Sequence, residues 1–456
     1  MEPVLKTGGR KRLVGSNPTP SARIGITANL ERKDDFVSEV RPRSTSSSER
    51  AAIARHGRLK RTNPFLTVLK FVSAALAVVL VSGAAVAAVS VNQITSKIKT
   101  VTLVGETEGP PPELGSYEGG FNILLVGSDS RAGSGEKGPS SVLNDVNILL
   151  HVSQDQTNAV AVSIPRDMVV PIPACPREDG KGNYHSMAGQ PINVTLSYGG
   201  LPCTVLTVSK LTGLDIQYAG LITFEGVINV STAVGGVPVC VNGRFHDPFT
   251  QLTLPSAGTY KLSGHDALMF LRSRHGVGDG SDLGRISSQQ VFLSSLVRMV
   301  KSDSTLNDFG KLFKIATAAT EGMTLSKSLN NINTMVSMAQ VLKKIPLDRI
   351  MFVQYPGTTG GTGLFTGKVQ PTTSLANALF AKIKADEPFS LEAGKTGRGS
   401  VVDPNAPTPT AAPAAPSAGS SAAPTDAPAD PATPAPVLQG VLGQSAADYT
   451  CSKVNN

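Results

Sequence analysis

The sequence predicts an α/β domain preceded by one transmembrane helix, and three observations support this. Strand-like apolar runs alternate with helical patterns between residues 121 and 391, a length sufficient for one large core. Residues 71–91 form an apolar run without a charged side chain. Residues 1–70 carry 15 Lys and Arg against six Asp and Glu, whereas the rest of the chain has a net charge of −1. The net charge of +8 therefore belongs to the N-terminal segment and does not indicate a nucleic-acid-binding domain.

The run at 71–91 is long enough to cross a bilayer as a helix. Five basic residues stand in the twenty positions before it and only Lys97 and Lys99 follow it closely, so the N-terminus is expected in the cytoplasm. Two alternatives are a buried core helix and a signal peptide cleaved at the AxA-like site Ala85-Val86-Ala87. A signal peptide would need an n-region of about seventy residues, far longer than usual. We expect an uncleaved signal anchor in the cell membrane, with the rest of the chain extracytoplasmic.

Composition divides the chain into six segments. We expect a disordered basic cytoplasmic tail (1–64), a signal-anchor helix (65–91), a stalk (92–115), a catalytic domain (116–391), a Pro/Ala-rich low-complexity tail (392–436) and a C-terminal segment (437–456). The last segment is expected to fold back onto the domain if Cys451 is bridged.

The four cysteines all lie on the predicted outer side of the membrane, where disulfides persist. No CxxC motif and no Cys/His spacing of a zinc site occurs. Four cysteines allow three pairings, of which we favour Cys175–Cys203.

Within the domain, the expected elements follow one another in a simple order. They are a buried strand (121–129), a hairpin (146–152 with 159–164), a helix (203–214), an extended segment (267–274) and a helix (285 to about 301). Arg272 and Arg274, two residues apart, are expected to share one side of the extended segment.

Arginines stand at the ends of several of these elements. Arg166 follows Pro165 at the end of a strand, and Arg285 shares a helix face with Gln289 just after Asp279 and Asp282. Together with Arg272 and Arg274, they suggest a polyphosphate cradle, because planar guanidinium groups bind phosphate oxygens in pairs and carboxylates hold their geometry. The alternative is a set of ordinary surface ion pairs.

Asp129 and Asp145 each lie at or just before the end of an expected strand. Two carboxylates beside phosphates commonly hold Mg²⁺ (or Mn²⁺), although aspartates also cap turns. Residues 133–138 match GxGxxG, but Pro139 follows in place of a helix, so we interpret them as a surface loop. The sequence has no GxSxG and no HExxH motif, which leaves serine-hydrolase and zincin functions without support.

From about residue 121 to 385 the chain resembles the LytR–CpsA–Psr family of cell-wall phosphotransferases. The resemblance rests on these ordered stretches: NILLVGSDSR (122–131), NDVNILLHV (144–152), SIPRD (163–167), YGG (198–200), LTGLDIQYAGLITFEGVINVSTAVGGVPVCV (211–241) and LSGHDALMFLRSRHGVGDGSDLGRISSQQ (262–290). It implies a central mixed sheet flanked by helices, with a hydrophobic tunnel for a polyprenyl chain.

The resemblance also implies an activity: transfer of a glycopolymer phosphate from a membrane-bound polyprenyl-pyrophosphate carrier to a peptidoglycan hydroxyl. The family's pyrophosphate-binding arginines match Arg166, Arg272, Arg274 and Arg285, and its metal-binding acids match Asp129 and Asp145. Asp167 and Gln289 match supporting positions, and Asp282 backs the arginines. We expect Asp129 or Asp145 to help deprotonate the acceptor hydroxyl.

One position departs from the family, since Ser288 stands where an arginine is common. This departure gives slight support to an alternative function, a regulatory polyprenyl-pyrophosphate-binding protein without turnover; a pyrophosphatase activity is a further alternative. The Ala/Pro-rich tail and the Gly/Ala/Val-rich composition suggest an actinobacterial source, and with it arabinogalactan or a related polysaccharide as the polymer.

Overall fold

The computed structural model describes residues 63–95, 98–106, 117–128, 142–177, 179–302, 314–315, 317–318, 322–406 and 435–455. The chain divides into two units, Met1–Phe71 and Val72–Asn456. Of the first unit only the beginning of helix α1 (Pro64–Thr95) is described. In the part of the chain that the structure covers, no helix combines the length and the apolar character needed to cross a membrane.

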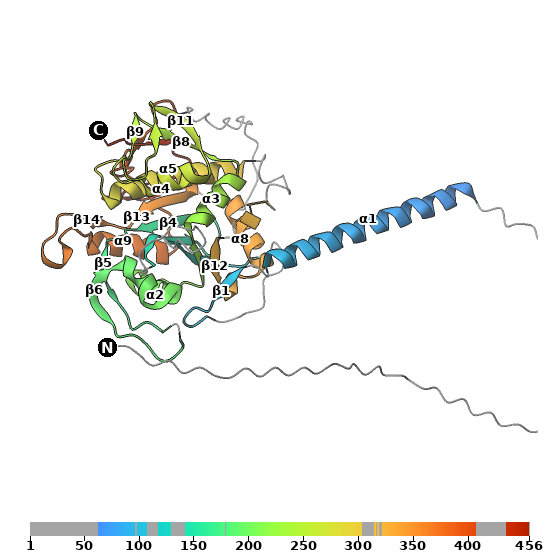
Figure 1. The fold of residues 1–456 in the computed structure, drawn as a ribbon, viewed down its shortest axis with the longest axis horizontal. Helices are drawn as coiled ribbons and strands as arrows, with labels where there is room; N and C mark the ends of the chain where they lie inside the picture. Colours follow the sequence, from blue (N-terminus) through green and yellow to red (C-terminus); the bar gives the residue numbers. More distant parts are fainter. Residues whose placement is uncertain are drawn as a thin grey trace, which may run out of the picture. The chain divides into compact units, whose positions relative to one another are not determined.

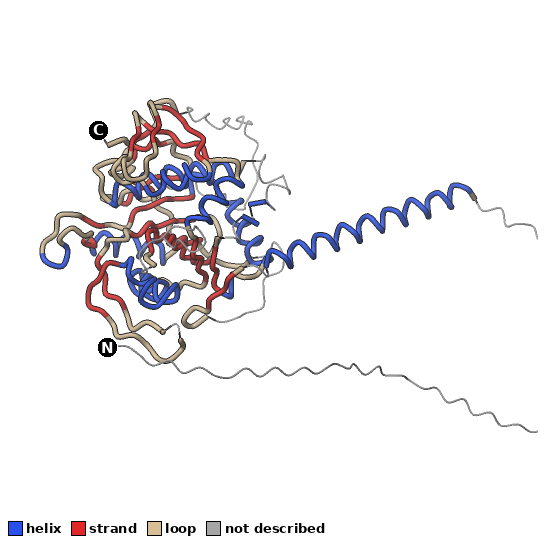
Figure 2. The backbone as a smooth tube through the Cα atoms, in the orientation of Figure 1, coloured by secondary structure: helices blue, strands red, loops and turns tan. Residues whose placement is uncertain are grey.

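The second unit is built on a mixed eight-stranded sheet, as expected (Figures 1 and 2). From edge to edge its strands are β1 (Lys99–Val101), β12 (Met323–Ser326), β7 (Tyr218–Ile222), β2 (Phe121–Ser128), β3 (Asn144–Val152), β4 (Ala159–Ile164), β13 (Ile350–Gln354) and β19 (Gly443–Ser445). Parallel pairs are β1–β12, β2–β7 and β4–β13, and the remaining neighbours are antiparallel.

The central strands are apolar on both faces because both faces are covered. Leu124 and Leu149 belong to one core with helices α2 (Thr195–Thr212) and α9 (Thr373–Lys384). Ile123 and Ala161 point to the opposite core, which includes α8 (Ile332–Lys344) and part of α5 (Asp282–Lys301). The alternation of neighbouring side chains between two cores explains why the sequence shows continuous apolar runs here.

The predicted hairpin is confirmed, and it determines where the polar strand ends meet. β3 and β4 pair antiparallel with Asn147 opposite Ile164, and β2 pairs with β3 so that Ser128 lies opposite Asn144. The end of β2, the beginning of β3 and the end of β4 therefore share one edge of the sheet. Asp145 and Arg166 are brought together at that edge.

A second sheet combines two strands from the middle of the chain with two from its C-terminal part. It consists of β11 (Gly258–Leu262), β8 (Val237–Val241), β20 (Thr450–Ser452) and β17 (Ser400–Val402). Its core packs against α3 (Phe224–Ala233), α4 (Gly264–Arg272) and α5, so α5 lies between the two sheets (Figure 1). The structured region thus extends beyond residue 391, and the C-terminal segment supplies one strand to each sheet.

Two-stranded ribbons complete the described fold. They are β5 (Val169–Ile172) with β6 (Met187–Pro191), β9 (Phe245–His246) with β10 (Thr253–Leu254), β14 (Gly357–Thr358) with β15 (Gln370–Pro371), and β16 (Ser390–Leu391) with β18 (Val437–Leu438). Short 3₁₀ turns lie at η1 (Ile192–Val194), η2 (Lys327–Leu329), η3 (Leu347–Arg349) and η4 (Gly363–Phe365).

Both disulfides join segments distant in sequence. The favoured pair Cys175–Cys203 is confirmed, and it ties the segment after β5 to α2. At Gly199 a side chain would meet Cys203 Cβ at 2.9 Å and Cys175 Cβ at 3.0 Å, so the kink of α2 requires glycine beside the bridge. Cys240–Cys451 links β8 to β20, which lie side by side in the second sheet.

The expectation of an extended segment at 267–274 is wrong. Residues Gly264–Arg272 form helix α4, and only Ser273 and the residues after it leave the helical conformation. The apolar residues at 267–270 are all buried, because α4 packs against α3 and α5. Arg272 and Arg274 therefore do not share one side of a strand.

Candidate functional site

The end of β4 delivers Arg166 to the edge of the central sheet. Pro165 ends the strand because it has no amide hydrogen for the ladder, and the Arg166 backbone amide instead donates to Asp282 Oδ2 at 3.1 Å. The Arg166 guanidinium pairs with Asp145 Oδ1, one residue inside β3. One arginine thus connects the β3 and β4 ends to the first turn of α5.

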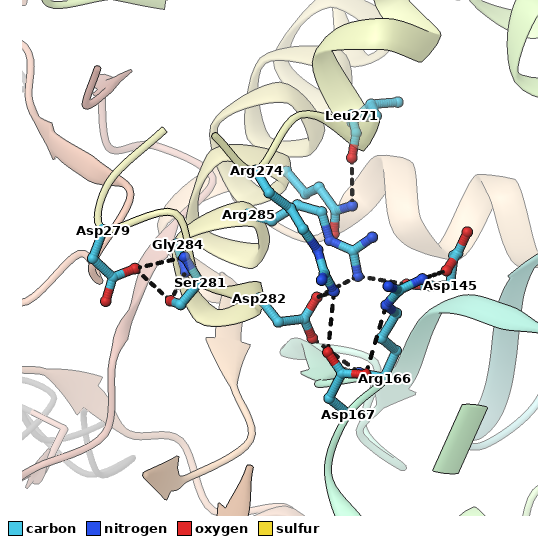
Figure 3. Close-up of polar contacts among 11 residues, drawn as sticks. Asp145, Arg166, Asp167, Leu271, Arg274, Asp279, Ser281, Asp282, Gly284 and Arg285 are labelled. Carbon is cyan, nitrogen blue, oxygen red and sulfur yellow. Dashed lines mark hydrogen bonds and ion pairs between the residues drawn. The ribbon is translucent and has the colours of Figure 1, made fainter. Parts of the chain in front are cut away.

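Asp282 begins α5 and lies at the centre of the arginine cluster (Figure 3). Its Oδ1 accepts a hydrogen bond from Arg274 at 2.6 Å and forms an ion pair with Arg285 at 2.5 Å, while its Oδ2 accepts from the Arg166 amide. The Asp282 side chain is 3% exposed and the Arg285 side chain 5%. A charge so thoroughly removed from water persists only when it is paired and hydrogen-bonded, and Asp282 meets both conditions.

Burial and charge act in opposite directions on the two buried groups. Burial of Asp282 disfavours its carboxylate, but attraction from Arg285, Arg274 and Arg166 outweighs this and holds its pKa below the usual range. Burial lowers the pKa of Arg285, and the nearby Asp282 charge opposes that shift. The Asp282 carboxylate is therefore ionised at neutral pH, and its negative charge stabilises the buried, positively charged guanidinium group of Arg285.

The other side of the cluster opens to solvent. Arg274 reaches from the segment after α4 to Asp167 Oδ2 at 3.2 Å as well as to Asp282. The side chains of Arg166 and Arg274 are 26% and 25% exposed, in contrast to Arg285. Arg285 therefore forms the buried side of the cluster, and the partly exposed guanidinium groups of Arg166 and Arg274 form its solvent-facing side.

Two guanidinium N–H groups in the cluster make no hydrogen bond within the described residues, although Arg166 Nε lies 3.8 Å from Asp167 Oδ1. The Nε atoms of Arg166 and Arg285 are buried, and neither makes a hydrogen bond among the described residues. The Nη2 atom of Arg285 forms an ion pair with Asp282 and donates a hydrogen bond to the Asp145 backbone carbonyl at 2.8 Å. A buried charged donor without an acceptor is costly. The partly exposed guanidinium groups of Arg166 and Arg274 are where an anion with several oxygens can bind.

A network of buried amides supports the β3 end, and the sequence analysis did not single it out. Asn144 Nδ2 donates to Asn147 Oδ1 at 2.6 Å, and Thr195 lies against Asn144 at 3.4 Å. Asn144 is fully buried and Asn147 is nearly so. Two asparagines in a strand that is largely apolar after Asp145 are the signal that could have identified this network.

Not all of the predicted site residues join the cluster. Arg272 lies over the Phe224 ring, with Cζ 4.4 Å from the ring centroid, and none of the ion pairs among the described residues involves it. Gln289 is buried, and its Nε2 donates to the Leu271 carbonyl at 2.8 Å, which holds α4 against α5. Asp129 lies outside the described residues.

The departure at Ser288 is explained by the C-terminal strand. Ser288 is buried, and its hydroxyl is 2.8 Å from that of Ser452 in β20. Position 288 thus faces the second sheet, whereas Arg285 faces the cluster. Ser288 therefore gives no support to a loss of turnover.

Asp145 is the described residue that fits a divalent cation. Its Oδ1 is engaged by Arg166, while its Oδ2 receives no hydrogen bond from the described residues, and the side chain is 15% exposed. Mg²⁺ is bound through one or two carboxylates together with waters and substrate phosphates, so one accessible carboxylate oxygen beside a phosphate-binding cluster suits it.

A cavity of about 950 Å³ lies elsewhere in the domain. His151, Asn158 and Met351 line it, at the opposite ends of β3, β4 and β13 from the cluster. It includes none of the clustered arginines. We therefore take the arginine cluster, not this cavity, as the candidate functional site, and we assign no substrate to the cavity.

Comparison with known proteins identifies similar sequences. The sequence model of the LytR_cpsA_psr family matches residues 78–381. The chain is 29% identical over 284 residues to the "Cell wall biosynthesis protein LcpA" of Corynebacterium glutamicum, covering 54% of this chain and 52% of that protein. It is 29% identical over 192 residues to the "Polyisoprenyl-teichoic acid--peptidoglycan teichoic acid transferase TagT" of Bacillus subtilis, covering 41% and 54%.

The chain spans about half the length of these curated relatives. Among solved structures, a LytR-Csp2A-Psr enzyme from Actinomyces oris aligns with a TM-score of 0.47 at 21% identity, covering 63% of this chain and 95% of that one.

We expect Asp282→Asn to lower the free energy of unfolding by about 3–5 kcal/mol, because it leaves Arg285 buried beside a neutral amide. Chemical denaturation at neutral pH measures this. The control is Glu387→Gln, which removes an exposed pair with Lys382 and is expected to cost less than about 1 kcal/mol. Equal losses in the two variants would contradict the central position of Asp282.

The pH dependence of the same comparison gives a second check. Because the pKa of Asp282 is lowered on folding, its contribution is complete above the unfolded-state pKa and is lost as the pH falls through the folded-state value. The difference in unfolding free energy between wild type and Asp282→Asn should therefore be constant near neutral pH and shrink below about pH 4. A difference that grows on acidification would contradict this account.

Proposed function

The chain belongs to the LytR–CpsA–Psr family, and on this premise we propose that it transfers a glycopolymer from a polyprenyl-pyrophosphate carrier to peptidoglycan. The observation that carries the proposal is the cluster of Arg166, Arg274 and Arg285, which carboxylates hold together while the Arg166 and Arg274 side chains remain partly exposed. A pyrophosphate group supplies several oxygens at the spacing that guanidinium groups bind. The relatives named for cell-wall biosynthesis and teichoic acid transfer support this choice.

In the proposed reaction a peptidoglycan hydroxyl attacks the phosphorus that bears the glycopolymer. A phosphodiester bond forms, the P–O–P bond breaks, and polyprenyl phosphate leaves with the electrons of that bond. Phosphoryl transfer depends mainly on positioning and charge stabilisation. Arg285, fixed by Asp282, would hold the pyrophosphate from the buried side, while Arg166 and Arg274 would neutralise charge on the leaving phosphate from the open side.

The peptidoglycan hydroxyl must lose its proton during the attack, which needs a general base on the solvent-facing side of the cluster. Asp145 is partly exposed and has one carboxylate oxygen free of hydrogen bonds from the described residues, so we propose it for this role. Asp129 follows β2 in the chain and is the second candidate, the one that applies when the free Asp145 oxygen binds the cation proposed below. We place Asp167 in a supporting role, because its carboxylate pairs with both Arg166 and Arg274.

We also propose that Asp145, with Asp129, holds Mg²⁺ or Mn²⁺. When bound, the cation would reduce the negative charge of the pyrophosphate. The support is the accessible Asp145 oxygen beside the arginines. We also propose a hydrophobic channel that holds the polyprenyl chain while the pyrophosphate head group of the carrier lies at the arginine cluster.

We expect Arg166→Ala to reduce kcat/KM for transfer at least about 100-fold, because it removes a charge from the transition state. The measurement uses the full chain in detergent, a synthetic lipid-linked sugar pyrophosphate, Mg²⁺ and a peptidoglycan oligomer, with the phosphodiester product quantified by mass spectrometry. Arg349→Ala, which loses an exposed arginine with one contact to Asn158, is the control and should keep full activity. Unchanged product formation by Arg166→Ala would reject the proposal.

Removal of divalent cations with EDTA should abolish transfer, and added Mg²⁺ should restore it. Asp145→Asn is expected to raise the Mg²⁺ concentration needed for half-maximal rate at least about tenfold, since even indirect partners of a metal contribute that much. The measurement is the rate of product formation across a Mg²⁺ titration. Full activity in EDTA would refute the metal, whereas an unchanged titration for Asp145→Asn would refute this ligand.

We further propose that residues 65–91 anchor the chain in the cell membrane, with the catalytic domain outside. The support is the uncharged run at 71–91 and the basic residues before it. In cells, the full chain is expected to stay in the membrane fraction after carbonate washing, and protease added outside should digest the domain. A chain that washes into the soluble fraction would refute the anchor.

A further inference from the structure

Asp247 is a buried carboxylate that the sequence analysis did not single out. It follows β9, and no part of it is exposed. Its Oδ1 accepts from the amides of Phe249 and Thr250 at 2.9 and 3.3 Å, which closes the turn between β9 and β10. None of the ion pairs among the described residues involves Asp247. This carboxylate is therefore held by hydrogen bonds to uncharged donors.

The second oxygen of Asp247 binds the segment that carries Arg274. Oδ2 accepts from the Ser273 hydroxyl at 2.5 Å, the Arg274 amide at 3.0 Å and the Gly276 amide at 3.1 Å. These donors lie in the connection between α4 and α5, where no helix or sheet supplies acceptors. A single carboxylate oxygen thus accepts from two backbone amides and one hydroxyl of this connection.

The connection lies directly on Asp247. A side chain at Gly276 would meet Asp247 Cβ at 3.1 Å and both Ser273 Oγ and the Phe245 ring at 3.0 Å. The Arg274 backbone is consequently held by its own amide hydrogen bond to Asp247 and by the Asp247 contacts of Ser273 and Gly276 on either side. From this fixed point the Arg274 side chain reaches Asp282 and Asp167.

Asp247 stays ionised in this setting. Burial opposes its charge, but hydrogen bonds from the Ser273 hydroxyl and from backbone amides outweigh burial and lower its pKa. An amide side chain at 247 could accept through one atom only and would present a donor where another acceptor is needed. The three contacts at Oδ2 or the two at Oδ1 would then be lost.

We propose that Asp247 is a positioning residue, which sets Arg274 at the angle needed to hold the substrate's pyrophosphate. It touches neither substrate nor Asp282, and it acts through the backbone from Ser273 to Gly276. This inference rests on the proposed function only in assigning Arg274 to the pyrophosphate.

The test is a double-mutant cycle of Asp247→Asn with Arg274→Ala in the full chain. The probe is geranyl pyrophosphate, a soluble short-chain polyprenyl pyrophosphate, and its dissociation constant is measured by calorimetry beside kcat/KM for transfer. We expect Asp247→Asn alone to weaken binding about tenfold, but less than about twofold when Arg274 is already alanine, because both changes remove one function. Equal losses in the two backgrounds would overturn the proposal, since a merely structural role does not depend on Arg274.

A matched control separates turn capping from positioning. Asp155 also caps a turn, accepting from the Ser153 hydroxyl at 2.6 Å and the Thr157 amide at 3.1 Å, in the turn between β3 and β4 at the far end of the hairpin. Asp155→Asn is expected to lower the melting temperature without changing pyrophosphate binding. Loss of binding in this control equal to that in Asp247→Asn would overturn the proposal.

Two further outcomes are distinguishable. If Arg274→Ala binds geranyl pyrophosphate like the wild type, the assignment of Arg274 in the proposed function fails, and this inference fails with it. If Arg274→Ala loses binding while Asp247→Asn keeps it, only the present inference is overturned. Should Asp247→Asn not fold, Ser273→Ala removes one donor to Oδ2 and is expected to weaken binding about threefold, again only when Arg274 is present.

Discussion

The carboxylate of Asp282 is shared by three arginines, and the geometry of the candidate site depends on this sharing. It accepts a side-chain hydrogen bond from Arg274 and a backbone hydrogen bond from Arg166, and it forms an ion pair with Arg285; these partners come from three separate elements. Because the group is nearly excluded from water, each partner compensates part of the cost of its burial. Asp282 thereby holds together the end of β4, the start of α5 and the connection after α4. Its negative charge offsets the repulsion between the three guanidinium groups, so they can lie close together.

The position of α5 between two sheets gives this point its rigidity. One face of the helix packs toward the central sheet and the other toward the sheet of β8 and β20. The Ser288–Ser452 contact and the Cys240–Cys451 bridge attach the C-terminal strand to the same region. The long Pro/Ala-rich interruption in the sequence therefore precedes a segment that completes the domain and supports the helix of Arg285.

Apolar periodicity and turn chemistry are local signals, and they predicted the β3–β4 hairpin and helix α5. The central mixed sheet was implied by the family resemblance, and Cys175–Cys203 was the favoured pair. The positions of the arginines at element ends suggested one cluster of Arg166, Arg272, Arg274 and Arg285 backed by carboxylates. The sequence did not predict helix α4, since the apolar run of five residues at 267–271 fits a strand as well as a helix, and so Arg272 was misplaced. The roles of Asp247 and of β20 depend on contacts between segments far apart in the chain, which no local pattern reveals.

The central claim is that the arginine cluster binds a pyrophosphate and directs its cleavage to an acceptor hydroxyl. Phosphorus-31 NMR of the full chain with a lipid-linked sugar pyrophosphate, Mg²⁺ and a peptidoglycan oligomer tests it most directly. We predict that the pyrophosphate signals decay while one phosphodiester and one phosphomonoester signal rise in equal amounts. Unchanged pyrophosphate signals, or two phosphomonoesters in place of a phosphodiester, would contradict the claim, the latter by showing that water is the acceptor.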